Sequence, residues 1–202
     1  MLSPANTEYH LLLASASPRR KALLASFGLA FDIVNADVDE SVLANESPLN
    51  YVQRVALLKA TSTASQHKGS YIIAADTTVV LGDRILGKPT DTHDAKAMLR
   101  DLSDRQHSVI SSVVLLNPLG VKTQQTVTTK VRFASLSEDD IATYCATKEP
   151  FDKAGSYAIQ GYGGRFVRSI EGSYSAVVGL PLYELSELLR QAGFEAGYGV
   201  LS

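Results

Sequence analysis

The chain has 202 residues, of which 45% are hydrophobic and 20% are charged, and its formal net charge is −2 at pH 7. This balance is typical of a soluble globular protein, and it excludes the strongly positive field that attracts nucleic acid polymers or membrane surfaces. No apolar run approaches the roughly 20 residues that span a bilayer, residues 1–10 lack the features of a signal peptide, and the one cysteine excludes an internal disulfide, so we expect a cytoplasmic protein.

The first half of the chain is predicted to alternate between strands and helices. Its predicted elements are, in chain order, a strand over 11–14, a helix ended by Gly28, a strand over 30–38, a helix over 46–64, a strand over 71–81 and a hairpin return over 82–87. Gly28 can adopt the left-handed conformation that follows a helix end. Ser47 is the predicted N-cap of the second helix, and Pro48 fits its first turn.

The second half continues this alternation. Its predicted elements are helices over 91–102, 137–147 and 182–193, strands over 107–116 and 121–136, and short strands within 155–168 and 173–178. Because hairpins interrupt the alternation of strands and helices, we expect an α/β fold with a mixed sheet. We expect one domain over 1–202, with an N-terminal extension over 1–10. Two lobes around a cleft are the alternative organisation.

The stretch "SASPRR" (15–20) lies where the first strand gives way to the first helix. Ser17 precedes a proline and is the predicted N-cap. The free amide groups of a first helical turn, together with the helix dipole, favour an anion. Arg19 and Arg20 add two charges, and Ser15 and Ser17 add hydroxyl groups. The corner is therefore a predicted phosphate site, and the alternative is a capped helix with two solvated arginines.

Lys59 continues an apolar stripe of the second helix. Val52, Val55 and Ala56 share one helix face by their three- and four-residue spacing, and Lys59 is the next position of that face. Either its side chain extends to water, which is the more common outcome, or it meets an anion inside a cleft.

Asp76 interrupts the apolar strand predicted over 71–81. A buried charge needs a partner, a metal ion or an open cleft. The alternative is a structural aspartate that caps a turn.

The stretch "GDRILGKP" (82–89) is similar to a phosphate loop. A phosphate loop needs a hydroxyl residue directly after the lysine, but this position is Pro89, so we reject a P-loop. Lys88 comes close to Asp76 if the hairpin return pairs with the strand.

A short acidic stretch follows the predicted strand over 30–38. Asp37, Asp39 and Glu40 supply oxygen ligands of the kind that hard cations prefer. A solvated acidic loop is the usual alternative. The four histidines have neither metal-ligand spacing nor partner cysteines, so we do not expect zinc.

The stretch "FDKAGSYAIQGYGGRF" (151–166) is rich in glycine, which lets backbone approach a ligand closely. Lys153, Tyr157 and Gln160 are candidates to line such an approach, and the Gln160 amide offers a donor and an acceptor to a base edge. An ordinary loop is the alternative. Together, the cationic positions, the carboxylates and this stretch indicate a cleft for a polyanionic small molecule with a metal ion, and hence phosphoryl or nucleotidyl chemistry.

Six motifs in this order resemble the Maf family of nucleoside triphosphate pyrophosphatases. They are "LASASPRRKALL", "DVDES", "AADTTVVL", "LGKP", "FDKAGSYAIQGYGG" and "VVGLPL", and the resemblance runs from about Leu11 to Leu189. It implies an elongated α/β fold with a central cleft, similar to that of inosine triphosphate pyrophosphatases (Ham1-like). It also implies hydrolysis of a nucleoside triphosphate to the monophosphate and pyrophosphate with a divalent cation such as Mg²⁺, Mn²⁺ or Co²⁺. The role that it implies for this reaction is to limit non-canonical or excess nucleotides.

The resemblance also assigns roles to residues. Asp76 is implied to be the proton acceptor, and Ser17, Arg20, Lys59 and Lys88 match positions of phosphate or catalytic contacts. Glu40 matches a metal position, which Asp76 would share.

Three positions distinguish the subgroups of this family. Arg19, Thr77 and Gln160 match the dTTP/UTP pyrophosphatase subgroup, whereas the subgroup acting on 7-methyl-GTP tends to have tryptophan, glutamine and glutamate there. The expected substrates are therefore dTTP and UTP. The alternatives are a pyrophosphatase selective for a modified purine and a nucleotide-binding regulator of cell division. A homodimer is left open.

Overall fold

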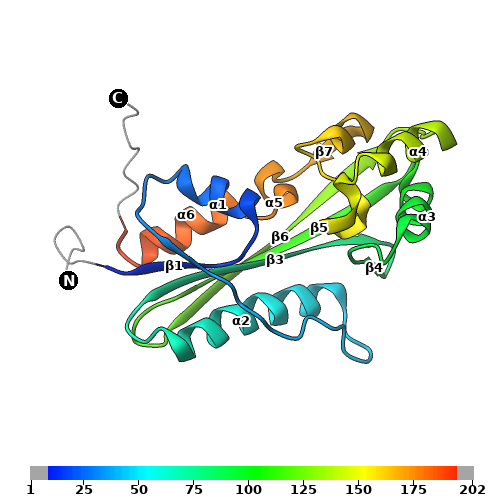
Figure 1. The fold of residues 1–202 in the computed structure, drawn as a ribbon. Helices are drawn as coiled ribbons and strands as arrows, with labels where there is room; N and C mark the ends of the chain where they lie inside the picture. Colours follow the sequence, from blue (N-terminus) through cyan, green and yellow to red (C-terminus); the bar gives the residue numbers. More distant parts are fainter. Residues whose placement is uncertain (1–8, 195–202) are drawn as a thin grey trace.

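A computed structural model describes residues 9–194, so most of the predicted extension over 1–10 lies outside the described residues. The structure is elongated, with long strands running through it and helices on both sides (Figure 1). The strands are β1 (Leu11–Ala14), β2 (Asp32–Val34), β3 (Tyr71–Leu81), β4 (Arg84–Leu86), β5 (Gln106–Leu116), β6 (Lys122–Phe133) and β7 (Val167–Glu171). The helices are α1 (Pro18–Ala25), α2 (Pro48–Gln66), α3 (Thr92–Leu102), α4 (Glu138–Ala146), α5 (Tyr174–Val178) and α6 (Leu182–Gln191), with short 3-10 helices η1 (Glu149–Asp152), η2 (Ala154–Ser156) and η3 (Tyr162–Phe166).

The strands form one seven-stranded sheet in the order β2-β1-β3-β5-β6-β7, and β4 pairs with β3. β1 is parallel to both β2 and β3, and the other pairings are antiparallel. The expected mixed α/β sheet is therefore confirmed. The single-domain organisation stays a prediction, with which this continuous sheet is consistent.

Alternation along β1 and β3 places side chains in two cores. Leu11, Leu13 and Ile73 face a core that α1 and α6 complete. The intervening residues Leu12 and Ile72 face a second core beneath α2. Figure 1 shows α1 and α6 on one side of the sheet and α2 on the other. The period of two along a strand thus decides which helix each side chain meets.

The far end of the long strands carries a third core. Phe133 and Leu99 are fully buried there, and Tyr144, Tyr157 and Phe166 pack around them. The helices α3 and α4 and the 3-10 helices cover this end (Figure 1). Because η1 and η2 rest on this core, the glycine-rich stretch has a fixed support next to β3.

Local signals predicted most elements correctly. Ser17, Ser47 and Ser137 are N-caps whose hydroxyl groups accept backbone hydrogen bonds, as predicted. The strand predicted over 71–81 matches β3, and the predicted hairpin return forms β4. Gly28 adopts a positive φ of 68°. Within residues 9–194, every helix is too short or too polar to cross a bilayer.

Three predicted strands are wrong in extent or type. Only Asp32–Val34 of the stretch 30–38 forms a strand, because the short β1 offers it three pairing positions. Half of 155–168 forms 3-10 helix, and the strand starts at Val167. The stretch 173–178 is helical, because Ser173 caps it by accepting from the amide of Ala176.

Candidate active site

The candidate site lies at a gap in one edge of β3. β1 pairs with residues 71–73 of this edge, and β4 pairs with residues 79–81. Between them, residues 74–78 have a strand neighbour only on the β5 side. The gap leaves Asp76 and Thr77 beside the loop that follows β1, on opposite faces of the strand.

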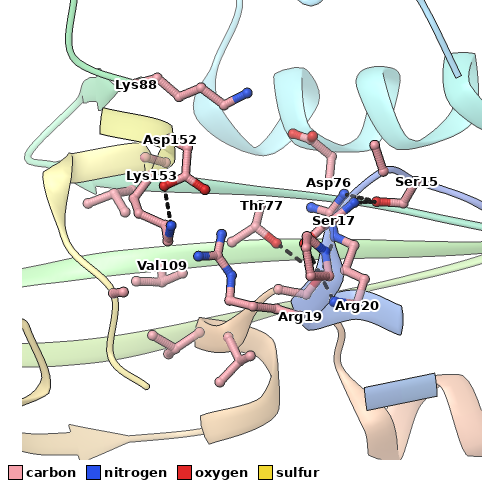
Figure 2. Close-up of a pocket in the computed structure, with 18 of the residues that line it drawn as sticks. Ser15, Ser17, Arg19, Arg20, Asp76, Thr77, Lys88, Val109, Asp152 and Lys153 are labelled. Carbon is pink, nitrogen blue, oxygen red and sulfur yellow. Dashed lines mark hydrogen bonds and ion pairs between the residues drawn. The ribbon is translucent and has the colours of Figure 1, made fainter. Parts of the chain in front are cut away.

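A cavity of about 550 Å³ opens at this gap. Its lining contains ten of the residues that the sequence predicted for the site. They are Ser15, Ser17, Arg19, Arg20, Glu40, Lys59, Asp76, Thr77, Lys88 and Gln160. Figure 2 labels seven of them, which approach from several elements, with the α1 corner on one side and the η1 segment on the other: Ser15, Ser17, Arg19, Arg20, Asp76, Thr77 and Lys88. The structure therefore brings together residues that are far apart in the chain.

The α1 corner has the geometry predicted for an anion site. Ser17 has extended backbone, and its Oγ accepts from the amide of Arg20 at 3.5 Å. Its own amide donates to Ser15 Oγ at 3.2 Å. Pro18 has no amide hydrogen and the Arg20 amide is taken by Ser17, so the Arg19 amide is the first-turn donor left for a ligand at the cavity wall, beside the two arginine side chains.

Arg20 is fixed by the backbone of Gly179. Its Nε donates to the Gly179 carbonyl at 2.8 Å, and its Nη1 lies 3.4 Å from Ser15 Oγ. Burial lowers the pKa of Arg20 from its ordinary value, while the charges of Asp76 and Glu40 raise it. Gly179 has a φ of 130°, a conformation that glycine adopts without strain. The "VVGLPL" stretch, through Gly179, thereby orients the Arg20 guanidinium in the cavity.

The Thr77 hydroxyl group lies within hydrogen-bond distance of two protein oxygens. Its Oγ1 lies 2.8 Å from Ser111 Oγ and donates to the Gly179 carbonyl at 3.4 Å. Its hydroxyl group thus already has protein partners. The contribution of Thr77 to substrate specificity remains a prediction. The structure places its hydroxyl group beside the Gly179 carbonyl, which also accepts from Arg20.

Lys59 lies between two carboxylates. Its Nζ donates to Asp76 Oδ1 at 2.8 Å and lies 2.9 Å from Glu40 Oε1. The Lys59 and Asp76 side chains are only 9% and 7% exposed, while Glu40 is 46% exposed. Of the two alternatives for Lys59, the structure shows the anion partner. Asp76 is correspondingly a paired strand residue and caps no turn.

Lys88 enters the cavity from the segment after β4 (Figure 2). The pairing of Val79 with Leu86 sets this position, as the hairpin prediction anticipated. Lys88 and Arg20 thus approach the Asp76 region from different elements.

The glycine-rich stretch forms the opposite wall with Asp152, Lys153 and Gln160. Glu149 organises it: the carboxylate accepts from the amides of Tyr162 and Gly163, each at 3.0 Å. A Cβ at position 161 would overlap this carboxylate, which explains the glycine there. Sequence reasoning did not identify Glu149 or Asp152, because no local pattern reveals partners that only the folded loop supplies.

Apolar side chains line part of the cavity. They include Val79, Val109 and Tyr157. Burial raises the pKa of Tyr157, whose hydroxyl lies 2.9 Å from His107 Nε2. Arg19 lies at the same wall, where burial lowers its pKa and the Asp152 charge raises it. This end of the cavity suits a flat, partly polar group.

The acidic stretch contributes only Glu40 to the cavity lining. Asp39 instead accepts from the amide of Ser41 at 2.9 Å, as part of a local turn. Within the described part of the chain, no three His, Cys, Asp or Glu side chains gather closely enough to hold a metal ion by themselves.

The family model described as Maf-like protein matches residues 10–192. The chain belongs to the Maf family. The motifs of that family surround the cavity: "SASPRR" forms its α1 corner, "AADTT" its strand, and "FDKAGSYAIQ" its far wall.

Relatives of this Maf chain match it over nearly its full length. The dTTP/UTP pyrophosphatase of Anaeromyxobacter dehalogenans is 52% identical over 187 residues, which cover 91% of this chain and 94% of that protein. The dTTP/UTP pyrophosphatase of Clostridioides difficile is 46% identical over 183 residues, which cover 90% and 94%.

Two solved structures are also similar to this Maf chain. A nucleoside-triphosphatase (dITP/XTP pyrophosphatase) from Mycobacterium abscessus has a TM-score of 0.48 and 18% identity, covering 91% of this chain and 97% of its own. A HAM1 protein from Coxiella burnetii has a TM-score of 0.49 and 16% identity, covering 91% and 99%.

Proposed function

We propose that this Maf protein hydrolyses dTTP and UTP to the nucleoside monophosphate and pyrophosphate. The observation that carries the proposal is the convergence of Asp76 with Arg20, Lys59 and Lys88 on one cavity. A triphosphate needs several cations, and hydrolysis needs a base near the attacked phosphorus. The names of the relatives support the choice of reaction and of substrates.

The triphosphate is proposed to lie between the α1 corner and Lys88. The Arg19 amide and the Arg20 side chain donate to phosphate oxygens, and Arg20 needs no movement because Gly179 already holds the guanidinium. Lys59 and Lys88 approach from other elements and stabilise the charge that grows on the leaving pyrophosphate. Fixed donors of this kind cost little reorganisation during the reaction.

Asp76 is proposed to accept a proton from the attacking water. As the water oxygen bonds to the α-phosphorus, the bond from this phosphorus to the bridging oxygen breaks, and pyrophosphate leaves with the electron pair. The proton passes to a carboxylate oxygen of Asp76, whose Oδ1 is held by Lys59 Nζ at 2.8 Å. The carboxylate has a second oxygen, Oδ2, for this role.

Asp76 and Glu40 fit a divalent cation that arrives with the substrate. Asp76 Oδ1 and Glu40 Oε1 lie 2.8 and 2.9 Å from Lys59 Nζ, so the two carboxylates are close enough for one cation beside Lys59 to reach both. One or two carboxylates plus phosphate oxygens are a common set for Mg²⁺. A bound cation of this kind would neutralise phosphate charge. Two carboxylates alone are a weak site, so we expect metal binding to depend on the triphosphate.

The base is proposed to lie at the apolar end of the cavity, beside Gln160. Uracil and thymine share an N–H group flanked by two carbonyl oxygens. The Gln160 amide can accept from that N–H and donate to a carbonyl, while Arg19 at the same wall can donate to another oxygen. This arrangement supports a preference for dTTP and UTP.

The test is a panel of nucleoside triphosphates that includes dTTP, UTP, CTP, ATP, ITP and 7-methyl-GTP, with Mg²⁺, Mn²⁺ or Co²⁺. Pyrophosphate and orthophosphate are measured separately. We expect metal-dependent release of pyrophosphate, fastest with dTTP and UTP. Release of orthophosphate alone, or a preference for 7-methyl-GTP, would overturn the proposal.

The proposed setting follows from the same chemistry. Nucleoside triphosphates are cytoplasmic metabolites, so we propose the cytoplasm as the site of action, with no nucleic acid polymer or membrane as partner. The mass of the purified protein in solution decides between a monomer and a homodimer.

A further inference from the structure

Glu40 lies on a loop that belongs to no helix or strand. The loop spans residues 35–47, between β2 and α2. Its Glu40 carboxylate nevertheless reaches Lys59, with Oε1 2.9 Å from Nζ. Because the Glu40 side chain is 46% exposed, this ion pair alone is weak. Another contact must hold the loop.

Arg54 makes that contact from the neighbouring helix. Its Nε donates to Glu46 Oε1 at 2.6 Å and its Nη2 donates to Glu46 Oε2 at 2.8 Å, which is a bidentate pair. The same Nη2 donates to the Ser41 carbonyl at 2.8 Å. Glu46 is only 7% exposed in its side chain. Arg54 therefore connects both ends of the segment that follows Glu40.

Hydrogen bonds within the loop transmit this anchor to Glu40. Glu46 Oε2 also accepts from the amide of Leu43 at 3.1 Å. Ser41 donates its amide and its hydroxyl group to Asp39 Oδ1, at 2.9 and 2.6 Å. Glu40 lies between these two residues, so its backbone is enclosed by a turn that Arg54 fixes to α2.

The helix that carries Arg54 is itself rigidly placed. Val52, Val55 and Ala56 are fully buried against the sheet. Lys59, the partner of Glu40, lies on the same helix. Because Arg54 and Lys59 both extend from α2, this helix holds the loop and the Lys59 ammonium group in a fixed relative position.

We propose that Arg54 is a positioning residue that holds Glu40 at the cavity for the metal–triphosphate complex. This inference rests on the proposed function. It assigns a role to a residue that does not line the cavity. Loss of the pair should weaken the contribution of the metal to substrate binding, while Asp76, Lys88 and the α1 corner keep their geometry.

The experiment compares Arg54→Met and Glu46→Gln with Arg100→Met. Arg100 also makes a bidentate pair, with Glu138 at 2.7 and 2.7 Å, but it connects α3 to α4 away from the cavity. It is therefore a control for loss of a bidentate Arg–Glu pair at a more exposed position, where the side chains are 45% and 67% exposed. Each variant is titrated with Mn²⁺ during dTTP hydrolysis. The affinity for a non-hydrolysable α,β-methylene analogue of UTP is measured with and without Mn²⁺.

We expect Arg54→Met and Glu46→Gln to raise the Mn²⁺ concentration for half-maximal rate about tenfold, as for loss of one charge-assisted hydrogen bond. The gain in analogue affinity on adding Mn²⁺ should shrink by a similar factor. The affinity for the analogue without Mn²⁺ should stay within about twofold of that of the unsubstituted protein. Arg100→Met should match the unsubstituted protein. In a Glu40→Gln background, Arg54→Met should add no further loss, because both changes remove the same contact.

Equal Mn²⁺ dependence in Arg54→Met, Glu46→Gln and Arg100→Met would overturn the inference. So would an additive loss in the Glu40→Gln background. If Arg54→Met does not fold, Glu46→Gln and Arg54→Lys, which keeps the charge but loses the fork, decide the question by the same measurements. Failure of the proposed function is distinguishable, because the unsubstituted protein would then show neither turnover nor Mn²⁺-dependent binding of the analogue.

Discussion

Replacing Lys59 by methionine tests whether the ion pair between Lys59 and Asp76 is as shielded from water as the structure shows. The change keeps the apolar stem of the side chain and removes the ammonium group. Asp76, whose side chain is 7% exposed, then loses its partner at 2.8 Å. Breaking a buried pair in this way costs about 3–5 kcal/mol in the free energy of unfolding.

Two further variants separate this cost from ordinary surface effects. Glu40→Gln removes the second contact of Lys59, but Glu40 is largely solvated, so the expected loss is at most about 1 kcal/mol. The double variant Lys59→Met with Asp76→Leu removes both buried charges. It should regain most of the stability, because neither member of the Lys59–Asp76 pair is left without its partner, and it should stay inactive.

The assay is urea unfolding followed by circular dichroism, since the chain contains no tryptophan. The linear dependence on urea gives the free energy for each variant. A loss below about 1 kcal/mol in Lys59→Met, equal to that of Glu40→Gln, would refute the reasoning. It would mean that cavity water solvates Asp76 and that the pair contributes little.

Three other predictions concern catalysis, selectivity and acid sensitivity. Asp76→Asn should lower kcat by about 10²–10⁴-fold while the affinity for the methylene analogue of UTP, measured without Mn²⁺, stays near that of the unsubstituted protein; near-normal turnover would remove Asp76 from the role of base. Gln160→Glu should lower kcat/KM for dTTP and UTP by about 10-fold or more, because a carboxylate cannot donate to a carbonyl, and unchanged selectivity across the triphosphate panel would contradict it. Burial lowers the pKa of His107 from 6.5 to about 4, so the unfolded chain binds a proton in this window that the folded protein does not. Stability should therefore fall by about 2 kcal/mol between pH 7 and pH 5 in excess of any fall in His107→Gln, measured by urea unfolding, and equal falls would count against this source.

Much of the fold was predictable because its signals are local. Ser17, Ser47 and Ser137 satisfy backbone amides only three residues away. The strand over 71–81 is β-branched along most of its length. The errors fall where distant contacts decide. The stretch 155–168 contains turns where the Glu149 carboxylate, which comes from outside the stretch, accepts from the amides of Tyr162 and Gly163.

The sequence by itself determined which residue types are available for the site. A doubled arginine at a capped helix start, a strand aspartate and a lysine on an apolar face are visible without coordinates. The resemblance to the Maf family joined these residues into one set. The sequence left two outcomes open for Lys59, solvent or a buried anion, because spacing fixes a helix face but not what packs on it.

Only the tertiary structure decided how these residues meet. The gap between β1 and β4 on one edge of β3 creates the cavity, and it depends on which strands pair. The chain then brings Gly179 to Arg20 across more than half its length and Glu46 to Arg54 from a loop. Such contacts are set by the packing of whole elements, which no local pattern records.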